Sequence, residues 1–315
     1  ALDFPLPLAG VNYFSFDFKG SGQQLNLFFG GVLLSVDYAD PNFLGSKFDA
    51  GADVFGIAFP LTDTLYRDDR EVEAEEVEAL PASFGLTLGR PLGSYVKARL
   101  GYDLSWINYG RTDATAPDFV PPNDTLTHSA SLGLRFARAG YQLNLQGALH
   151  RRAEWEPWGF IGRNPDFDPD KNEYARWEVE ASKSFYPGPF QRLGLEAGYY
   201  AGDNLDRFSK YEFGFFGGTR VHGYQSSRVR AEEAVATHLS YGFGLGEGLR
   251  LDAVADTAWA TDEASGLRSE LLAGVGLAGT FMGPWQTIVN LDFGVPVAGP
   301  DDGFVVYVVF LKLFR

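Results

Sequence analysis

The chain has 315 residues, a formal net charge of −15 at pH 7 and no cysteine. This acidity argues against nucleic acid as a partner, because phosphate binding requires a basic surface, and the lack of cysteine excludes disulfides and thiolate metal sites. Aromatic residues make up 15% of the chain and 38 residues are glycine, which suits a large β structure. No break in composition divides the sequence, so we expect one domain over residues 1–315.

No run of eighteen apolar residues is present, so no membrane helix is expected. The segment after Ala1 also lacks the apolar core of a signal peptide.

Residues 1–8, ALDFPLPL, carry two prolines at alternate positions. Backbone N–H groups two residues apart in a strand point to the same side, so Pro5 and Pro7 would remove donors from one strand edge over about 7 Å. Proline is tolerated only at sheet edges. If this stretch is a first strand, its depleted edge faces the closing strand that contains Phe310 and Phe314, and we expect a weak seam between them.

Segments of about ten alternating apolar and polar residues recur along the chain, which is typical of a transmembrane β-barrel. Leu143 and Leu145, for example, share one face of their segment, while Asn144 and Gln146 share the other. The expected strands are residues 12–18, 23–29, 32–40, 47–59, 82–90, 95–108, 125–137, 141–152, 174–186, 190–200, 231–243, 248–260, 269–281, 285–296 and 304–314. Barrels usually close with an even number, so a sixteenth strand is expected in residues 1–8 or upstream.

The second face of these segments is charged, which separates a barrel from a soluble sandwich. Buried unpaired charge is prohibitive in a dry core, whereas a water-filled lumen tolerates it. The residues concerned are Lys97, Arg99, Asp103, Arg135, Glu178, Glu180, Arg192, Glu196, Asp252, Asp256 and Asp292. We therefore expect an all-β fold, a transmembrane antiparallel barrel of about 16 strands with Leu100, Leu134 and Leu251 among its lipid-facing residues.

The connections between the expected strands alternate between short and mostly longer ones. Bacterial barrels have short periplasmic turns and long extracellular loops, which fixes the orientation. The short links are residues 19–22, 42–46, 90–94, 137–140, 187–189, 244–247 and 282–284; the longer ones are 60–81, 110–124, 153–173, 201–230, 261–268 and 297–303. The acidic stretch at 67–78 is interpreted as a solvated loop rather than a cation site.

Three further patterns have both a structural and a functional interpretation. Tryptophans at or near strand ends favour membrane interfaces, with sugar binding as the alternative; they are Trp106, Trp155, Trp158, Trp177, Trp259 and Trp285. The acidic run at 166–172 begins like a calcium loop, but Lys171 stands where glycine is needed. The four histidines show no zinc or Ser/His/Asp spacing, so we expect no enzyme and no cofactor.

Residues 213–224, FGFFGGTRVHGY, called the finger below, are too aromatic and glycine-rich for an ordinary exposed loop. Glycines permit turns that other residues resist, and alternate residues would face one side of an extended segment. We expect the finger to pack inside an enclosed space. The residues that define it are Gly217, Gly218, Arg220, Val221, His222, Gly223 and Tyr224.

The finger resembles the sixth-loop motif of the outer-membrane protein assembly factor superfamily (BamA/TamA-like, bacterial surface antigen type), whose C-terminal barrel holds this loop in its lumen. Most motif positions match, but His222 stands where the family has arginine, and Arg220 is the nearest guanidinium. Residues 249–260 resemble the family strand whose aspartate faces the loop tip; Asp256 falls at that position, and Ala258 replaces a family glycine. The resemblance covers every strand after the finger and is looser in the N-terminal third.

The resemblance implies a barrel in the bacterial outer membrane that helps other outer-membrane proteins fold and insert. In this family the first and last strands are thought to part and to template an incoming strand. Partners would be outer-membrane lipid, unfolded clients and periplasmic accessory proteins, without a cofactor. A two-partner-type secretion pore and a barrel anchor or export module of a larger polypeptide remain open. A cation on His222 or Arg220 should bond to Asp256, worth about 1.5–3 kcal/mol.

Overall fold

The structure is a computed structural model that describes residues 10–67, 70–164, 166–214, 220–224, 229–245, 248–262, 267–283, 287–299 and 303–312, except for the side chains of 267–269, 283 and 310–312. Several residues of the sequence predictions lie outside this part of the chain: Pro5, Pro7, Gly217, Gly218, Phe314 and the side chain of Phe310. The weak seam inferred from them stays a prediction.

The described residues form one large antiparallel sheet whose strands follow one another in chain order. Every strand expected from alternation is found at its place. The strands are β1 (Val11–Phe18), β2 (Gln23–Phe29), β3 (Leu33–Asp40), β4 (Asp49–Ile57), β8 (Val77–Pro91), β9 (Val96–Arg111), β10 (Thr125–Arg138), β11 (Tyr141–Arg152), β12 (Glu173–Phe185), β13 (Gln191–Asp203), β16 (Glu233–Gly244), β17 (Leu249–Asp262), β18 (Leu267–Gly283), β19 (Thr287–Ala298) and β20 (Val305–Lys312).

A sixteenth member of the sheet, β5 (Leu61–Asp63), pairs with β8 beyond the end of β4. It pairs with β8 on the same side as β4 does, further along the strand, and therefore adds no position to the strand order. Smaller elements occupy the loops: β6 (Tyr66–Arg67), β7 (Arg70–Glu71), β14 (Tyr211–Phe213), β15 (Val229–Ala231) and the 3₁₀ turns η1 (Phe43–Gly45), η2 (Glu73–Glu75) and η3 (Pro169–Asn172). No helix in the described parts of the chain is long and apolar enough to cross a membrane.

Cross-strand register confirms the two faces that alternation predicts. Leu134 stands opposite Leu145, and the next pair places Arg135 opposite Asn144. Leu100 is 57% exposed on the outer face. An apolar outer face and a charged inner face are what a lipid-facing wall around an aqueous lumen requires.

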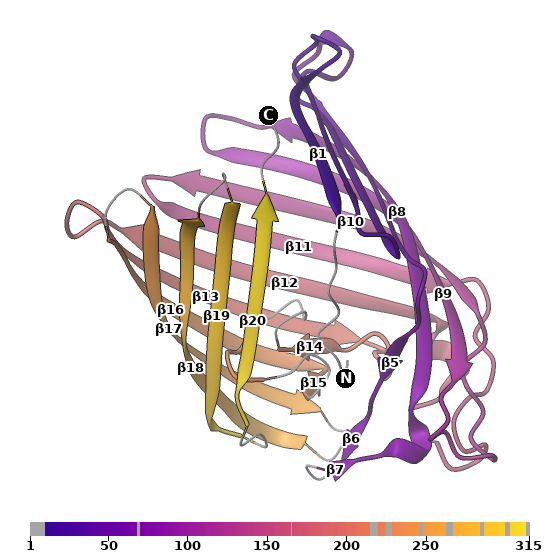
Figure 1. Cartoon of the computed structure of the whole chain (residues 1–315). Helices are drawn as coiled ribbons and strands as arrows, with labels where there is room; N and C mark the ends of the chain where they lie inside the picture. The colour runs from indigo at the N-terminus through magenta and orange to yellow at the C-terminus, as the bar shows by residue number, and fades with distance from the viewer. Residues whose placement is uncertain are drawn as a thin grey trace.

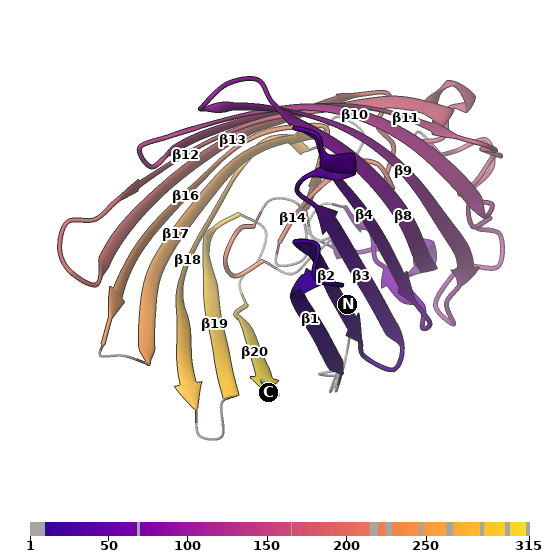
Figure 2. The same ribbon diagram turned by 90° about the horizontal axis from the view of Figure 1, so that it is seen from above.

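The sheet curves round until its ends face each other (Figure 2). Each of the pairings along the order from β1 to β20 is antiparallel. Because that order has an odd number of strands, β1 and β20 run in the same direction. Within the described residues they are not paired with each other, so an antiparallel closure needs one more strand between them.

Three tryptophans lie where the interface prediction requires them. Trp106, Trp177 and Trp259 lie on the outer face near the long-loop ends of their strands and are between 41% and 54% exposed. Trp155 and Trp158 correct it, since both are buried in a cluster with Phe119. They follow the end of β11, where the chain turns into a loop that folds inward. Trp285 lies outside the described residues.

The cluster belongs to a loop cap, formed by residues 64–67, 70–76, 112–124, 153–164, 166–172 and 204–210 at the long-loop end of the barrel (Figure 1). The acidic stretch at 67–78 is part of it, which corrects the prediction that this stretch is merely solvated. Glu75 is 8% exposed and accepts hydrogen bonds from Arg67, and Val77 is fully buried. Aromatic side chains from other loops bury part of this stretch, and the sequence of the stretch alone gives no sign of them.

Candidate functional site

The finger leaves the wall between β13 and β16 and lies inside the curve of the sheet, where Figure 2 shows β14. Its base is a short antiparallel ladder of β14 and β15, in which Tyr211 stands opposite Ala231 and Phe213 opposite Val229. The tyrosine hydroxyl lies 3.1 Å from two carbonyl oxygens of the wall strands and donates its one hydrogen between them. The base is therefore fixed to the inner face of the barrel.

Apolar packing holds the described part of the finger against the wall. Val221 and Tyr224 are each 1% exposed. They belong to one buried cluster with small wall residues such as Ala236 on β16 and Ala258 on β17. Small side chains on the wall leave the space that the finger fills. The prediction of an enclosed, packed finger is confirmed for its described residues.

Glycines allow the finger backbone to approach the wall closely. A Cβ atom on Gly274 of β18 would lie 1.7 Å from the carbonyl oxygen of His222, and one on Gly294 of β19 would lie 2.5 Å from the amide nitrogen of Gly223. Gly223 itself has φ +89°, a conformation that side chains disfavour. A substitution at any of these positions would force the fingertip away from β18 and β19.

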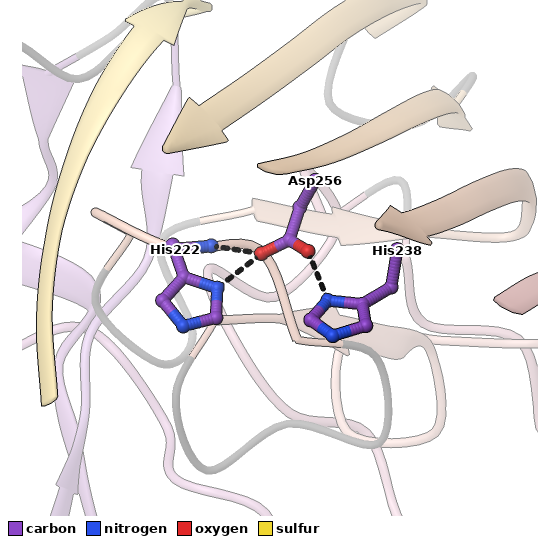
Figure 3. A group of neighbouring side chains, drawn as sticks. All are labelled: His222, His238 and Asp256. Carbon is purple, nitrogen blue, oxygen red and sulfur yellow. Dashed lines mark hydrogen bonds and ion pairs between the residues drawn. The ribbon is translucent and has the colours of Figure 1, made fainter. Parts of the chain in front are cut away.

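The fingertip is bound to Asp256 of β17 by His222. The backbone N–H of His222 donates to Asp256 Oδ2 over 2.8 Å, and its Nδ1 contacts the same oxygen. The other oxygen, Oδ1, contacts Nδ1 of His238 on β16 (Figure 3). One carboxylate, 1% exposed, thus receives two imidazoles, whose rings lie 6.1 Å apart and nearly parallel at 21°.

Arg220 does not reach Asp256. Its guanidinium forms an ion pair with Asp292 on β19, and His222 Nε2 lies 3.5 Å from the same carboxylate. The sequence prediction that His222 or Arg220 pairs with Asp256 is therefore confirmed for the histidine. The alternative in which the arginine makes that pair is wrong, because Arg220 precedes His222 by two residues and projects to the neighbouring strand.

The two carboxylates determine the charge of the fingertip. Burial alone would lower the pKa of His222, because a charged imidazole is less well solvated there. The hydrogen bond to Asp256 and the proximity of Asp292 outweigh burial and raise this pKa above its ordinary value. Protonation of His222 therefore strengthens the fingertip contact.

His238 is the part of the site that sequence reasoning missed. It stands directly opposite Asp256 in the ladder between β16 and β17. Alternation places both side chains on the inner face, but the pairing requires the register across the connection between the two strands. A cross-strand register assigned from the expected turn at 244–247 would have predicted that His238 lies opposite Asp256.

The acidic run at 166–172 is used in internal contacts. Asp166 forms an ion pair of 3.5 Å with Lys210, and the Asp168 side chain accepts a 2.9 Å hydrogen bond from the amide of Asp170 at the start of η3. These carboxylates fasten the loop cap.

No protein-family model matches the chain, and no curated protein matches its sequence. Solved structures do share its fold. BamA from Haemophilus ducreyi lacking POTRA domains 1–3 aligns with a TM-score of 0.58 and 14% identity over 96% of this chain and 69% of that one. CdiB from Acinetobacter baumannii aligns with a TM-score of 0.57 and 12% identity over 96% and 55%. CdiB from Escherichia coli aligns with a TM-score of 0.60 and 15% identity over 93% and 57%. The fold is that of these outer-membrane barrels, and the chain spans just over half the length of the two CdiB structures.

Proposed function

We propose that this chain resides in the bacterial outer membrane and helps other outer-membrane proteins fold and insert, using the two end strands of its sheet as the working surface. The observation that carries the proposal is the pair of edge strands β1 and β20, which are not paired with each other within the described residues. Outer-membrane lipid and unfolded client chains are the partners, with periplasmic accessory proteins as a further class. No catalysis is involved.

An unpaired edge strand presents a row of N–H and C=O groups that can pair with another chain. An unfolded outer-membrane protein consists of segments that seek such partners, so it can add a strand by β-augmentation. Because β1 and β20 run in the same direction, one antiparallel strand fits between them in the ladder. This geometry supports insertion through the wall of the barrel.

The loop cap speaks against a passive pore. Arg207, in the loop between β13 and β16, bonds to Asp63 of β5 over 2.8 Å and to the Glu75 carbonyl over 2.7 Å. Strands β9 to β12 separate β8, the partner of β5, from β13 in the sheet, so these bonds span the lumen. A solute would have to displace them, whereas a client entering at the seam would not.

A two-partner secretion pore is the second candidate. The likeness to CdiB, with TM-scores of 0.57 and 0.60, is as close as the likeness to BamA. Secretion would require that a partner protein pass through the lumen, and therefore that the finger and the loop cap move. In a third arrangement, the barrel is the anchor or export module of a larger polypeptide, and it would then act only on its own chain.

Cross-linking the seam tests the proposal. The natural sequence has no cysteine, so cysteines at Tyr13 and Val308 can be joined selectively by bismaleimides of graded length. The protein is reconstituted in liposomes and given a urea-unfolded outer-membrane barrel as client; folded client is measured by its heat-modifiable migration on gels. We expect joining β1 to β20 to abolish the acceleration of client folding.

The matched control joins two strands that are already paired. Leu291 of β19 stands opposite Val308 of β20, so a cross-link between cysteines there leaves the seam free and should leave client folding unchanged. Undiminished folding with the seam joined would contradict insertion at the seam. Export of a partner protein through the joined barrel would favour the secretion pore.

A further inference from the structure

Two imidazoles and one carboxylate converge where the finger meets the wall. The ligand atoms of His222, His238 and Asp256 all lie within 4.8 Å of one another. Figure 3 shows the carboxylate between the two rings, with each Nδ1 directed at a different oxygen. We propose that these three residues bind a divalent transition-metal ion of the zinc class, which fastens the finger to the barrel wall.

The donor atoms select the class of ion. Zinc is bound by histidine nitrogen and carboxylate oxygen at about 2.0–2.2 Å, and three protein ligands leave a fourth position for water. Calcium and magnesium prefer shells made of oxygen, so two imidazoles disfavour them. The ion takes the place of a proton on each Nδ1. A protonated imidazole releases that proton to solvent as the ion binds, whereas a neutral imidazole keeps its single proton on Nε2.

The surroundings support a bound cation. His222 and Asp256 are 4% and 1% exposed, so two of the ligands are held in place by packing. Nε2 of His222 points toward Asp292, 3.5 Å away, and metal-bound histidines commonly direct their second ring nitrogen at a carboxylate.

The lumen provides a path of entry. His238 lines a cavity of ≈ 500 Å³ together with Glu180 and Glu196, and its side chain is 28% exposed. A hydrated ion can reach the third ligand from this cavity and keep a water molecule on that side. Because Lys183, Arg192 and Arg220 also line this cavity, its wall provides a wet route for the ion but no net negative charge.

The ligands come from three elements, the finger, β16 and β17. The full set therefore exists only while the finger is folded inward, and the ion stabilises that state by mass action. With free ion at 100 times its dissociation constant, the released fraction of the finger should fall about 100-fold.

The test uses the whole protein in detergent after removal of metals by a chelator. Isothermal titration with Zn²⁺ gives the stoichiometry and affinity, Co²⁺ absorption reports coordination, and protease cleavage within residues 203–232 reports release of the finger. We expect one ion per chain and slower cleavage when Zn²⁺ is present. His238→Asn keeps the His222–Asp256 contact and should weaken Zn²⁺ binding at least 10-fold, with cleavage in chelator unchanged.

The chain offers a matched control because its other two histidines, His128 and His150, are bonded elsewhere, to Tyr102 and Ser129. The double variant His128→Asn/His150→Asn should bind Zn²⁺ as the natural protein does. Heat-modifiable migration verifies that each variant is folded. The proposal is overturned if the natural protein binds no stoichiometric ion, if His238→Asn binds equally well, or if the double variant alone loses binding.

Discussion

The long loop between β13 and β16 is fastened to the barrel at two places that use different cations. At the loop cap, Arg207 of the cap and Arg230 of β15 share the carboxylate of Asp63 on β5. At the fingertip, the imidazole of His222 bonds to Asp256. A guanidinium stays charged at every pH a protein meets, whereas an imidazole changes charge near neutrality. The cap is thus a permanent attachment, and the fingertip is one that can be released while the cap holds.

Burial adds to this difference. The side chains of Arg207 and Arg230 are 1% and 6% exposed, and the desolvated charge of each depends on its partner. Burial alone would lower the pKa of Arg230, but Asp63 and Glu212 raise it above its ordinary value. Removing one partner of such a pair leaves a buried charge uncompensated, which is more costly than the pair is stabilising.

The largest expected effect is therefore on the cap. Asp63→Ala should destabilise the cap by about 3–5 kcal/mol, because two buried guanidiniums lose their carboxylate. Urea-dependent protease cleavage of the loop cap measures this. The matched control is Glu173→Ala, which removes the exposed pair with Arg151, 62% and 71% exposed, and should cost about 0–1 kcal/mol. Equal effects of the two substitutions would mean that the cap is not held by Asp63.

Both attachments lie inside a wall whose outer face contacts lipid and whose inner face contacts water. Substitutions at two neighbouring residues of β11 test this assignment of the faces. Leu145→Arg places a charge in lipid and should cost about 2–4 kcal/mol, whereas Gln146→Arg on the lumenal face should cost far less. Folding of each variant into bilayers across a urea series measures the difference. Equal destabilisation would contradict the barrel in a membrane.

The next effect is on the fingertip alone. Asp256→Ala removes the acceptor of His222 and should release the fingertip at a cost of about 1.5–3 kcal/mol, while the barrel and the cap stay folded. Cleavage within residues 203–232 should rise, and heat-modifiable migration should be unchanged. Cleavage that does not rise would show that apolar packing around Val221 and Tyr224 suffices to hold the finger.

The wall was predictable from the sequence because lipid and lumen impose opposite polarities on alternate residues. For example, the polarity of Arg135 and Leu134 alone assigns the first to the lumenal face and the second to the lipid face. The inward finger was also predictable, because a segment so rich in glycine and aromatic residues is not expected in a solvent-exposed loop. Its partner Asp256 followed from resemblance rather than from periodicity.

Contacts that depend on distant parts of the chain were not predictable. His238 meets Asp256 only through the register of two strands. Trp158 is buried by Phe119 and Phe208, which come from other loops. The sequence around Trp158 contains no pattern that predicts these contacts. Where alternation stops, burial depends on how separate loops fold together.

The smallest expected effect is a pH dependence that separates the two attachments. Because contact with Asp256 raises the pKa of His222, its contribution is fully present below the unfolded value of about 6.5 and is lost as pH rises through the folded value. The loss is partial, since the backbone N–H of His222 still donates to Asp256. In chelator, cleavage at the fingertip should therefore increase from pH 6 to pH 9, while the loop cap, held by guanidiniums, stays protected. His222→Arg supplies a permanent cation, so its cleavage should not vary over this range; a variant that follows the same pH curve as the natural protein would place the titration elsewhere.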